Sequence, residues 1–246
     1  MKLDDELLAY LRGERYANTV KIDYRFEPED WRYRTQIDWL CDLVRGKRVV
    51  HVGCVDHTID TIRHKLQRRK WLHARLCESA ARCHGVDIQG DGITFIKEEL
   101  GLTDVSCADI LGDAFAETIS GEQWDFMLIP EVLEHLQDPT GFLRQVAAHH
   151  GKTFPAVIIT VPNALARDNC RLARRGIEAI NSDHCHWFTP YTAAKMMVNA
   201  GLELEKVLLC RHGTINRQSV LKTWYLRRHP LLRNDILCIA RFAGRR

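Results

Sequence analysis

The sequence predicts one α/β domain of 246 residues, built on a mostly parallel sheet with helices on both faces. Short apolar segments rich in valine and isoleucine alternate along the chain with segments whose apolar residues recur at helical spacing, and this alternation is typical of parallel strands joined by helices. Apolar residues make up 46% of the chain and charged residues 27%, so neither a disordered nor a fibrous protein is expected.

The first half of the chain supplies a cap and the first strands. Residues 1–45 are charged and aromatic, and we expect them to form an N-terminal helical cap on a main domain at 46–246. The β-branched segment 48–54 predicts the first strand. Helical spacing of apolar residues over 58–81 predicts a helix with a break near Arg69.

The remaining elements continue the alternation. Apolar composition predicts further strands at 83–87, 105–107, 125–129, 156–161, 204–210 and 235–242. Helices are expected after residue 87 and at 131–136, 140–149 and 190–200. The clearest buried strand is 156–161, because five of its six residues are apolar and Pro162 ends it. Gly201 is a standard helix stop.

Composition also excludes several classes of protein. The net charge of +3 is too small to imply a nucleic-acid partner, because the twelve histidines can shift it by more than that excess. The acidic start of the chain is unlike a signal peptide, and no apolar run approaches the roughly 20 residues needed to span a membrane. The nine cysteines are spaced singly and form no CxxC pair, so we expect reduced core thiols in a cytoplasmic protein rather than a disulfide framework or a zinc ribbon.

Three successive strand ends carry residues suited to a nucleoside ligand. In a parallel sheet, ligands bind beyond the carboxyl ends of the strands. Gly53 follows the first strand and allows close approach of the backbone, Asp87 ends the second and can accept hydrogen bonds from ribose hydroxyls, and Asp109 follows the third beside Ile110. Each alone is also compatible with a structural turn or a capped helix, but their succession favours a binding site.

The chain resembles class I S-adenosylmethionine-dependent methyltransferases over residues 48–201. The segments that carry the resemblance are VVHVGC (49–54), HGVDI (84–88), ADI (108–110), WDFMLIPEVLEHLQDP (124–139), VIITVPN (157–163) and DHCHWFTPYTAAKMMVNAGL (183–202). The resemblance implies a Rossmann-like, seven-stranded, mostly parallel sheet and S-adenosyl-L-methionine as the cofactor. The chain departs from the family pattern in its first loop, where Val55 replaces a second glycine and His51 stands in place of an acid.

The resemblance also implies the contacts of the cofactor. It places the methionine moiety near Gly53 and Cys54, and the ribose on Asp87. The adenine would lie beside Ile88, Asp109 and Ile110. Tyr33 and Arg34, in the segment before the first strand, are further candidates, since an arginine can pair with the donor carboxylate.

Methyl transfer to a hydroxyl requires alignment of donor and acceptor and is assisted by a general base. The candidate catalytic residues are Glu131, His135, His184 and His186. The Asp-Pro-Pro-Tyr type of signature is missing after the fourth strand, where Ile129-Pro130-Glu131 stands instead, so methylation of DNA amines is disfavoured.

A divalent cation is a secondary expectation. Glu131, Glu134 and His135 are spaced to share one helix face, and with His184 they resemble the metal site of methyltransferases that act on the terminal ribose of small RNAs. Acid–base or packing roles for these residues are favoured over the metal.

The sequence therefore predicts an enzyme that methylates an oxygen, or less favourably a ring nitrogen, of a small metabolite such as a sugar intermediate or natural-product scaffold. A metal-dependent RNA 2′-O-methyltransferase and a catalytically inactive binding protein of the same fold are the alternatives. Basic stretches at 63–75 and 211–233 are interpreted as solvated faces, although the second contains Trp224 and Tyr225 and would suit a phosphorylated substrate. A nucleic-acid or membrane partner is not expected, and the sequence specifies no oligomeric state.

Overall fold

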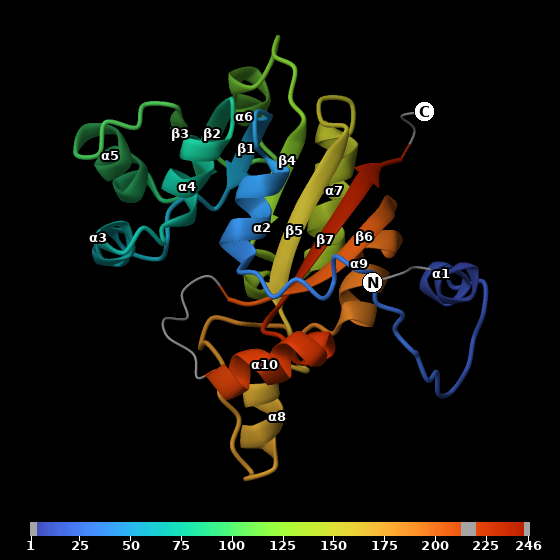
Figure 1. Cartoon of the computed structure of the whole chain (residues 1–246). Coiled ribbons are helices and arrows are strands. Elements are labelled where there is room, and N and C mark those ends of the chain that lie inside the picture. The colour runs from blue at the N-terminus through green and yellow to red at the C-terminus, as the bar shows by residue number, and fades with distance from the viewer. Residues whose placement is uncertain (1–3, 213–219, 244–246) are drawn as a thin grey trace.

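The computed structural model describes residues 4–212 and 220–243 and shows a seven-stranded sheet with helices on both faces (Figure 1). The strands lie in the order β3-β2-β1-β4-β5-β7-β6. Their bounds are β1 Arg48–Val52, β2 Arg82–Asp87, β3 Val105–Cys107, β4 Phe126–Pro130, β5 Ala156–Pro162, β6 Leu202–Cys210 and β7 Asp235–Phe242. Only β7 runs antiparallel to its neighbours, so the predicted mostly parallel Rossmann-like sheet is confirmed.

The helices connect the strands and cap the domain. Their bounds are α1 Asp5–Arg12, α2 Gln36–Leu43, α3 Ile59–Gln67, α4 Leu72–Ser79, α5 Gly90–Glu98, α6 Asp113–Thr118, η1 Leu133–His135, α7 Pro139–His150, α8 Arg167–Ala173, α9 Pro190–Asn199, α10 Val220–Arg228 and η2 Pro230–Leu232. None of the helices within these described ranges is long and apolar enough to cross a membrane.

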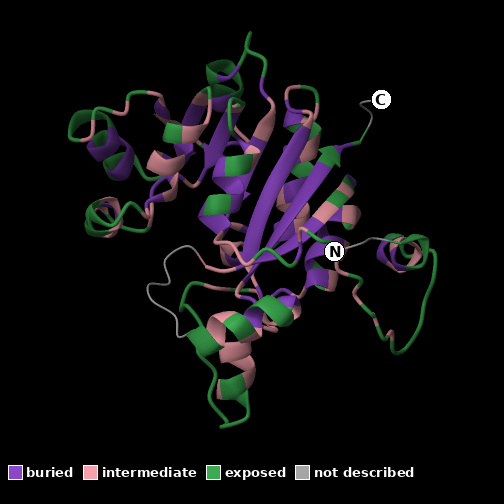
Figure 2. Cartoon of the chain, viewed as in Figure 1, coloured by how far each residue is buried: buried purple, intermediate pink, exposed green. Residues whose placement is uncertain are grey.

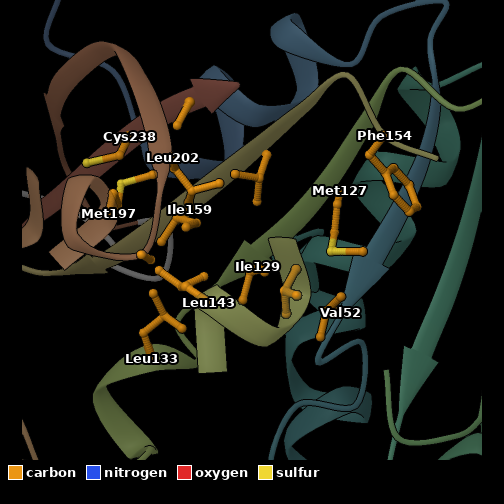
Figure 3. Packing of buried hydrophobic residues seen from close by; sticks show 14 of the residues in the cluster. Val52, Met127, Ile129, Leu133, Leu143, Phe154, Ile159, Met197, Leu202 and Cys238 are labelled. Atoms are coloured by element: carbon orange, nitrogen blue, oxygen red, sulfur yellow. The ribbon is translucent and has the colours of Figure 1, made fainter. Parts of the chain in front are cut away.

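Alternation along the central strands divides the core between the two faces of the sheet. In β4, Met127 and Ile129 join the larger cluster, which also contains residues of α6, α7 and α9. Leu128 lies between them in sequence and joins the cluster on the opposite face with α2 and α4. Successive residues of a strand point to opposite faces of the sheet, and here both faces are covered by helices. The central strands are therefore buried along their length (Figure 2), and the side chains of the larger cluster pack closely (Figure 3).

The predicted helix at 131–136 is wrong. Glu131 has a left-handed backbone with φ of 53°, and its N–H bonds to the carbonyl of Thr160 in β5, so the chain stays paired with the sheet for one more residue. Only the short turn η1 follows. The break predicted near Arg69 is confirmed, since α3 ends just before it and Arg69 itself has φ of 54°.

The N-terminal segment lies against the C-terminal half of the chain. In α1, Leu7 and Leu11 pack with Ala194 of α9. Arg233, which is fully buried, donates hydrogen bonds to five carbonyls, and the shortest are those to Asp30 (2.6 Å), Leu209 (2.8 Å) and Leu226 (3.1 Å). One guanidinium thus joins the segment before α2 to β6 and α10, and its burial lowers its pKa to about 10.

Candidate active site

The loop after β1 turns at Gly53, at the carboxyl ends of the central parallel strands. Gly53 has φ of 76°, and its N–H donates to the carbonyl of Val86 in β2 at 2.9 Å. A Cβ at this position would lie 3.0 Å from Cγ2 of Val132, which is tighter than ordinary contact. Both the backbone angle and the limited space therefore require glycine here.

The structure explains the valine that replaces the second glycine of this loop. Val55 is buried, and its side chain packs against Gly92 in α5, where an added Cβ would lie only 2.4 Å from Cγ1 of Val55. Val55 therefore requires a glycine at the facing position of α5. The loop still turns, because Gly53 has a left-handed backbone.

Asp87 ends β2 and holds the loop in place. Its carboxylate accepts hydrogen bonds from the N–H groups of Val55 (2.8 Å) and Gln89 (3.0 Å). Burial raises the pKa of Asp87, and these backbone donors oppose that shift. Because a carboxylate offers about four lone-pair directions, Asp87 keeps acceptors for two ribose hydroxyls while it fixes the turn.

The expected adenine contacts occupy different environments. Ile88 is 76% exposed at the strand end, where an uncovered apolar side chain is suited to a flat ring. Asp109 is exposed and accepts a hydrogen bond from the N–H of Leu111 at 3.0 Å. Ile110 is instead buried in the larger core cluster, and Cys54 is also buried, only 1% exposed.

The two candidates before the first strand are engaged with protein groups. Arg34 forms an ion pair with Asp42 of α2 and lies over the ring of Trp39 at 5.1 Å. Tyr33 lies beneath the guanidinium groups of Arg211 and Arg233, at 5.9 Å and 5.5 Å. Both contacts tie this segment to its surroundings.

Glu131 stands at the end of β4 and is held by two side chains that the sequence did not indicate. Its Oε1 accepts hydrogen bonds from the amide of Gln36 at 3.0 Å and the hydroxyl of Thr160 at 2.9 Å. Burial and the nearby carboxylate of Asp235 raise the pKa of Glu131 to about 7. Such a carboxylate can take up and release a proton near neutral pH.

Glu134 lies beside two histidines. One ligand atom from each of Glu134, His135 and His184 lies within 4.8 Å of the other two, and the histidine rings meet edge to face at 4.7 Å. Glu134 is fully buried, and neither of its carboxylate oxygens has a hydrogen-bond partner among the described residues. Burial and the neighbouring Glu131 raise its pKa to about 9, so the carboxyl group is protonated near neutral pH unless a bound cation stabilises its charged form.

The histidines differ in their surroundings. Burial lowers the pKa of both His135 and His184, which keeps the imidazoles neutral and able to accept a proton or a metal. The imidazole of His186 lies with Nε2 3.3 Å from the carbonyl of Gln137, while its backbone N–H donates to the carbonyl of Glu134 at 3.2 Å. The side-chain cluster with Glu134 and His135 therefore contains His184 and not His186.

Three further residues near this site were missed by sequence reasoning. His57 follows the first loop, and its ring centroid lies 6.0 Å from that of His135. His212 forms an ion pair with Asp235 at 3.2 Å, and both come within 4.8 Å of Glu131. The sequence could have indicated His57, because it lies next to the glycine loop. It could not have indicated His212 and Asp235, because only the order of the strands in the sheet brings them to Glu131.

An open hollow of about 440 Å³ lies elsewhere, between the segment 17–24 and the start of α9. Its lining includes Ile22, Tyr24 and Tyr191. It contains none of the residues expected to bind the cofactor or to act on the substrate.

The strand order, the left-handed glycine after β1 and the carboxylate that ends β2 define an S-adenosylmethionine-dependent methyltransferase of class I. A family model described as a methyltransferase domain matches residues 4–207, and the chain belongs to this family. No curated protein sequence matches the chain.

Solved structures share the fold at low sequence identity. The small RNA methyltransferase HEN1 superposes with a TM-score of 0.55 at 15% identity, over 94% of this chain and 28% of that longer chain. The Haloferax volcanii protein in complex with the methyltransferase activator Trm112 gives 0.51 at 14% identity, over 83% and 88% of the two chains. An S-adenosylmethionine-dependent methyltransferase from Clostridium acetobutylicum gives 0.50 at 9% identity, over 89% and 93%.

Proposed function

We propose that this methyltransferase transfers the methyl group to a hydroxyl oxygen of a small metabolite, with sugar intermediates and natural-product scaffolds as the substrate classes to test first. The observation that carries the proposal is the cluster of Glu134, His135 and His184 at the end of β4, next to the glycine loop. S-adenosyl-L-methionine, when bound, supplies an electrophilic methyl group on a sulfonium.

A hydroxyl is a weak nucleophile near neutral pH, so its proton must be removed as the new bond forms. Glu131 is suited to this task, because its pKa of about 7 matches the operating pH and Gln36 and Thr160 fix its carboxylate. The neutral imidazoles of His135 and His184 are the other proton acceptors of the site. An amine acceptor, in contrast, is a better nucleophile and has less need of these proton-accepting side chains.

The residues after β1 and β2 fit the cofactor. Gly53 leaves a cradle that a Cβ would fill, Asp87 presents carboxylate oxygens, and Ile88 offers an exposed apolar side chain. We assign the methionine moiety to Gly53, the ribose to Asp87 and the adenine to Ile88 with Asp109. Tyr33, Arg34, Cys54 and Ile110 would support this pocket from behind, since each is buried or bound to protein groups.

A divalent cation fits the same cluster. Glu134 has a buried carboxylate without a hydrogen-bond donor in the described parts of the chain, and Nδ1 of His184 is likewise buried without a partner there. Glu134, His135 and His184 would hold the ion, with Glu131 beside them. Bound there, a cation would polarise the acceptor oxygen and lower the pKa of its hydroxyl.

The same cluster supports a second candidate function, methylation of an RNA ribose hydroxyl. The similarity of fold to the small RNA methyltransferase HEN1 also supports this candidate. The basic stretches favour the small metabolite instead. In the first, Arg63 pairs with Glu99 and Lys65 with Asp56. In the second, the fully buried Arg233 serves the fold, and Arg217 lies outside the described residues. Cations already paired or buried contribute little to phosphate binding.

Methyl transfer from radiolabelled S-adenosyl-L-methionine tests the proposal. The acceptors are a panel of nucleotide sugars and phenols, matched amines, and a short RNA with a free terminal ribose, each assayed with and without a chelator. We expect transfer to hydroxyl acceptors of small size. Transfer to amines alone would contradict the proposal, and chelator-sensitive transfer to RNA that falls steeply with salt would establish the second candidate. Absence of cofactor binding by calorimetry would indicate the inactive binding protein.

A further inference from the structure

A second cluster of ligating side chains lies away from the active site, between α4 and the sheet. His73 and Cys77 are on successive turns of α4, Cys83 is on β2, and His51 is on β1. One ligand atom from each of His73, Cys77 and Cys83 lies within 4.8 Å of the other two. None of these four residues has a part in the methyl transfer described above.

The contacts within the cluster are short and specific. Nδ1 of His73 lies 3.9 Å from Sγ of Cys83, and Nε2 of His73 lies 3.7 Å from Sγ of Cys77. The same Nδ1 of His73 lies 3.2 Å from Nδ1 of His51, and the two imidazoles stack at 5.3 Å. Side chains from three elements therefore gather around the ring of His73.

His51 of β1 packs against this group. It is only 2% exposed, and its Nδ1 is the nitrogen that faces His73.

The geometry suits a tetrahedral ion. With Zn–N of about 2.0–2.1 Å and Zn–S of about 2.3 Å, two nitrogens of a tetrahedral site lie about 3.3 Å apart and a nitrogen and a sulfur about 3.6 Å apart. Nε2 of His73 lies 3.7 Å from Sγ of Cys77 and Nδ1 lies 3.9 Å from Sγ of Cys83, so each sulfur is near the nitrogen-to-sulfur distance from one of the two ring nitrogens.

We propose that His73, Cys77 and Cys83 bind one Zn²⁺ ion. Thiolate and imidazole ligands select Zn²⁺ over Mg²⁺ or Ca²⁺. Cys77 is partly exposed on α4 and provides the route of entry.

The ion would stabilise the elements that carry the cofactor loops. It would join α4 to β2, four residues before Asp87. The ring of His73 also lies so close to β2 that a Cβ at Gly85 would be 2.6 Å from it. Trp71, next to His73 at 5.4 Å, donates from Nε1 to the carbonyl of Cys54 at 3.2 Å.

Cobalt substitution of the full chain tests this site. Protein purified under reducing conditions, stripped of metal and titrated with Co²⁺, should bind one equivalent with an intense sulfur-to-cobalt absorption band that Zn²⁺ abolishes. Cys77→Ser and Cys83→Ser should each lose about half of that band, because each removes one of two thiolates. Cys107→Ser is the matched control, since Cys107 is exposed and outside the cluster, and its band should equal that of the parent.

Two results would overturn the proposal. One is a parent protein that gives no sulfur-to-cobalt band although all its thiols are titratable. The other is a band that survives intact in both Cys77→Ser and Cys83→Ser. The proposal would also be overturned if Cys77 and Cys83 form a disulfide again after reduction and the protein binds no Co²⁺.

A second measurement, the change of Tm on addition of Zn²⁺, shows whether each variant is folded and distinguishes this site from the active site. Zn²⁺ should raise the Tm of Glu134→Ala, in which the active-site cluster has lost a ligand, but not that of the double variant Glu134→Ala/Cys77→Ser, since Cys77 is at a partly exposed helix position where serine is tolerated. An equal rise of Tm in the double variant would contradict the assignment. Neither measurement depends on which substrate is methylated.

Discussion

The side-chain amide of Gln36 donates a hydrogen bond of 3.0 Å to the carboxylate of Glu131, 95 residues further along the chain. The same amide also donates to Thr160, which in turn donates to Glu131 at 2.9 Å. The start of α2 thus fixes the carboxylate at the end of β4. Since hydrogen bonds to a carboxylate favour its charged form, Gln36 tunes the group proposed as the base.

Gln36→Leu should shift the pH dependence of turnover. Loss of the amide donor raises the pKa of Glu131 above its value of about 7, so the rising limb of the rate profile moves to higher pH. Measurement of kcat against pH checks this, with the exposed Gln123→Leu as the control. An identical profile in Gln36→Leu would remove Glu131 from the role of base.

Glu131→Gln and His184→Ala should lower kcat by about 100-fold or more, the contribution typical of general acid–base groups. Cofactor affinity, measured by calorimetry, should stay near that of the parent, because neither residue is assigned to the cofactor. His186→Ala is the matched control, since its ring faces the carbonyl of Gln137. A stronger effect in His186→Ala than in His184→Ala would reverse the assignment.

Asp87→Ala should weaken binding of S-adenosyl-L-methionine by about 1–3 kcal/mol, through loss of bonds to a charged acceptor. Part of the loss arises from the loop, because the N–H groups of Val55 and Gln89 lose their partner. Calorimetry of Asp87→Ala beside the exposed Asp109→Ala gives the comparison, and the latter should be the milder. Equal affinity in parent and Asp87→Ala would mean that the pocket lies elsewhere.

Gly92→Ala should destabilise the protein by about 1–3 kcal/mol, the cost typical of overpacking. The added methyl would stand 2.4 Å from Cγ1 of Val55. Val55→Ala removes that obstacle, so the double variant should recover part of the loss. Denaturant unfolding of the four proteins gives the coupling energy, and strict additivity would contradict the packing described for the loop.

The pair of His212 and Asp235 should make stability depend on pH at the alkaline side. Burial disfavours the charged imidazole, but the charge and hydrogen bond of Asp235 prevail and raise the pKa of His212 to about 9. The stabilisation is therefore complete below the unfolded value of about 6.5 and is lost as the pH rises through about 9. Unfolding free energies of the parent should fall over this window, and those of His212→Ala should fall less.

The strands were the predictable part of the fold. β7 was predicted with its observed bounds, and β5 was recognisable because its residues are buried on both faces and Pro162 ends it. The segment after β4 was not predictable in the same way. A local helical pattern at 131–136 gives way to pairing of Glu131 with β5, which is a tertiary contact.

The two sites also differ in how far the sequence could predict them. Gly53 and Asp87 lie next to strand ends, so the order of elements along the chain was enough to bring them together. The cluster of His51, His73, Cys77 and Cys83 was not foreseen, because sequence spacing gave no CxxC pair and its members come from two strands and a helix. Cysteines that stand alone in sequence need not stand alone in space.

The buried guanidinium of Arg233 joins parts of the chain that are synthesised far apart in time. It donates to the carbonyl of Asp30, which leaves the ribosome some two hundred residues earlier. The stretch ahead of α2 is also held by the ion pair of Glu29 with Lys206 and by backbone hydrogen bonds to Arg211, both in the last fifth of the chain. The contacts that hold this stretch therefore form only after most of the polypeptide has been made.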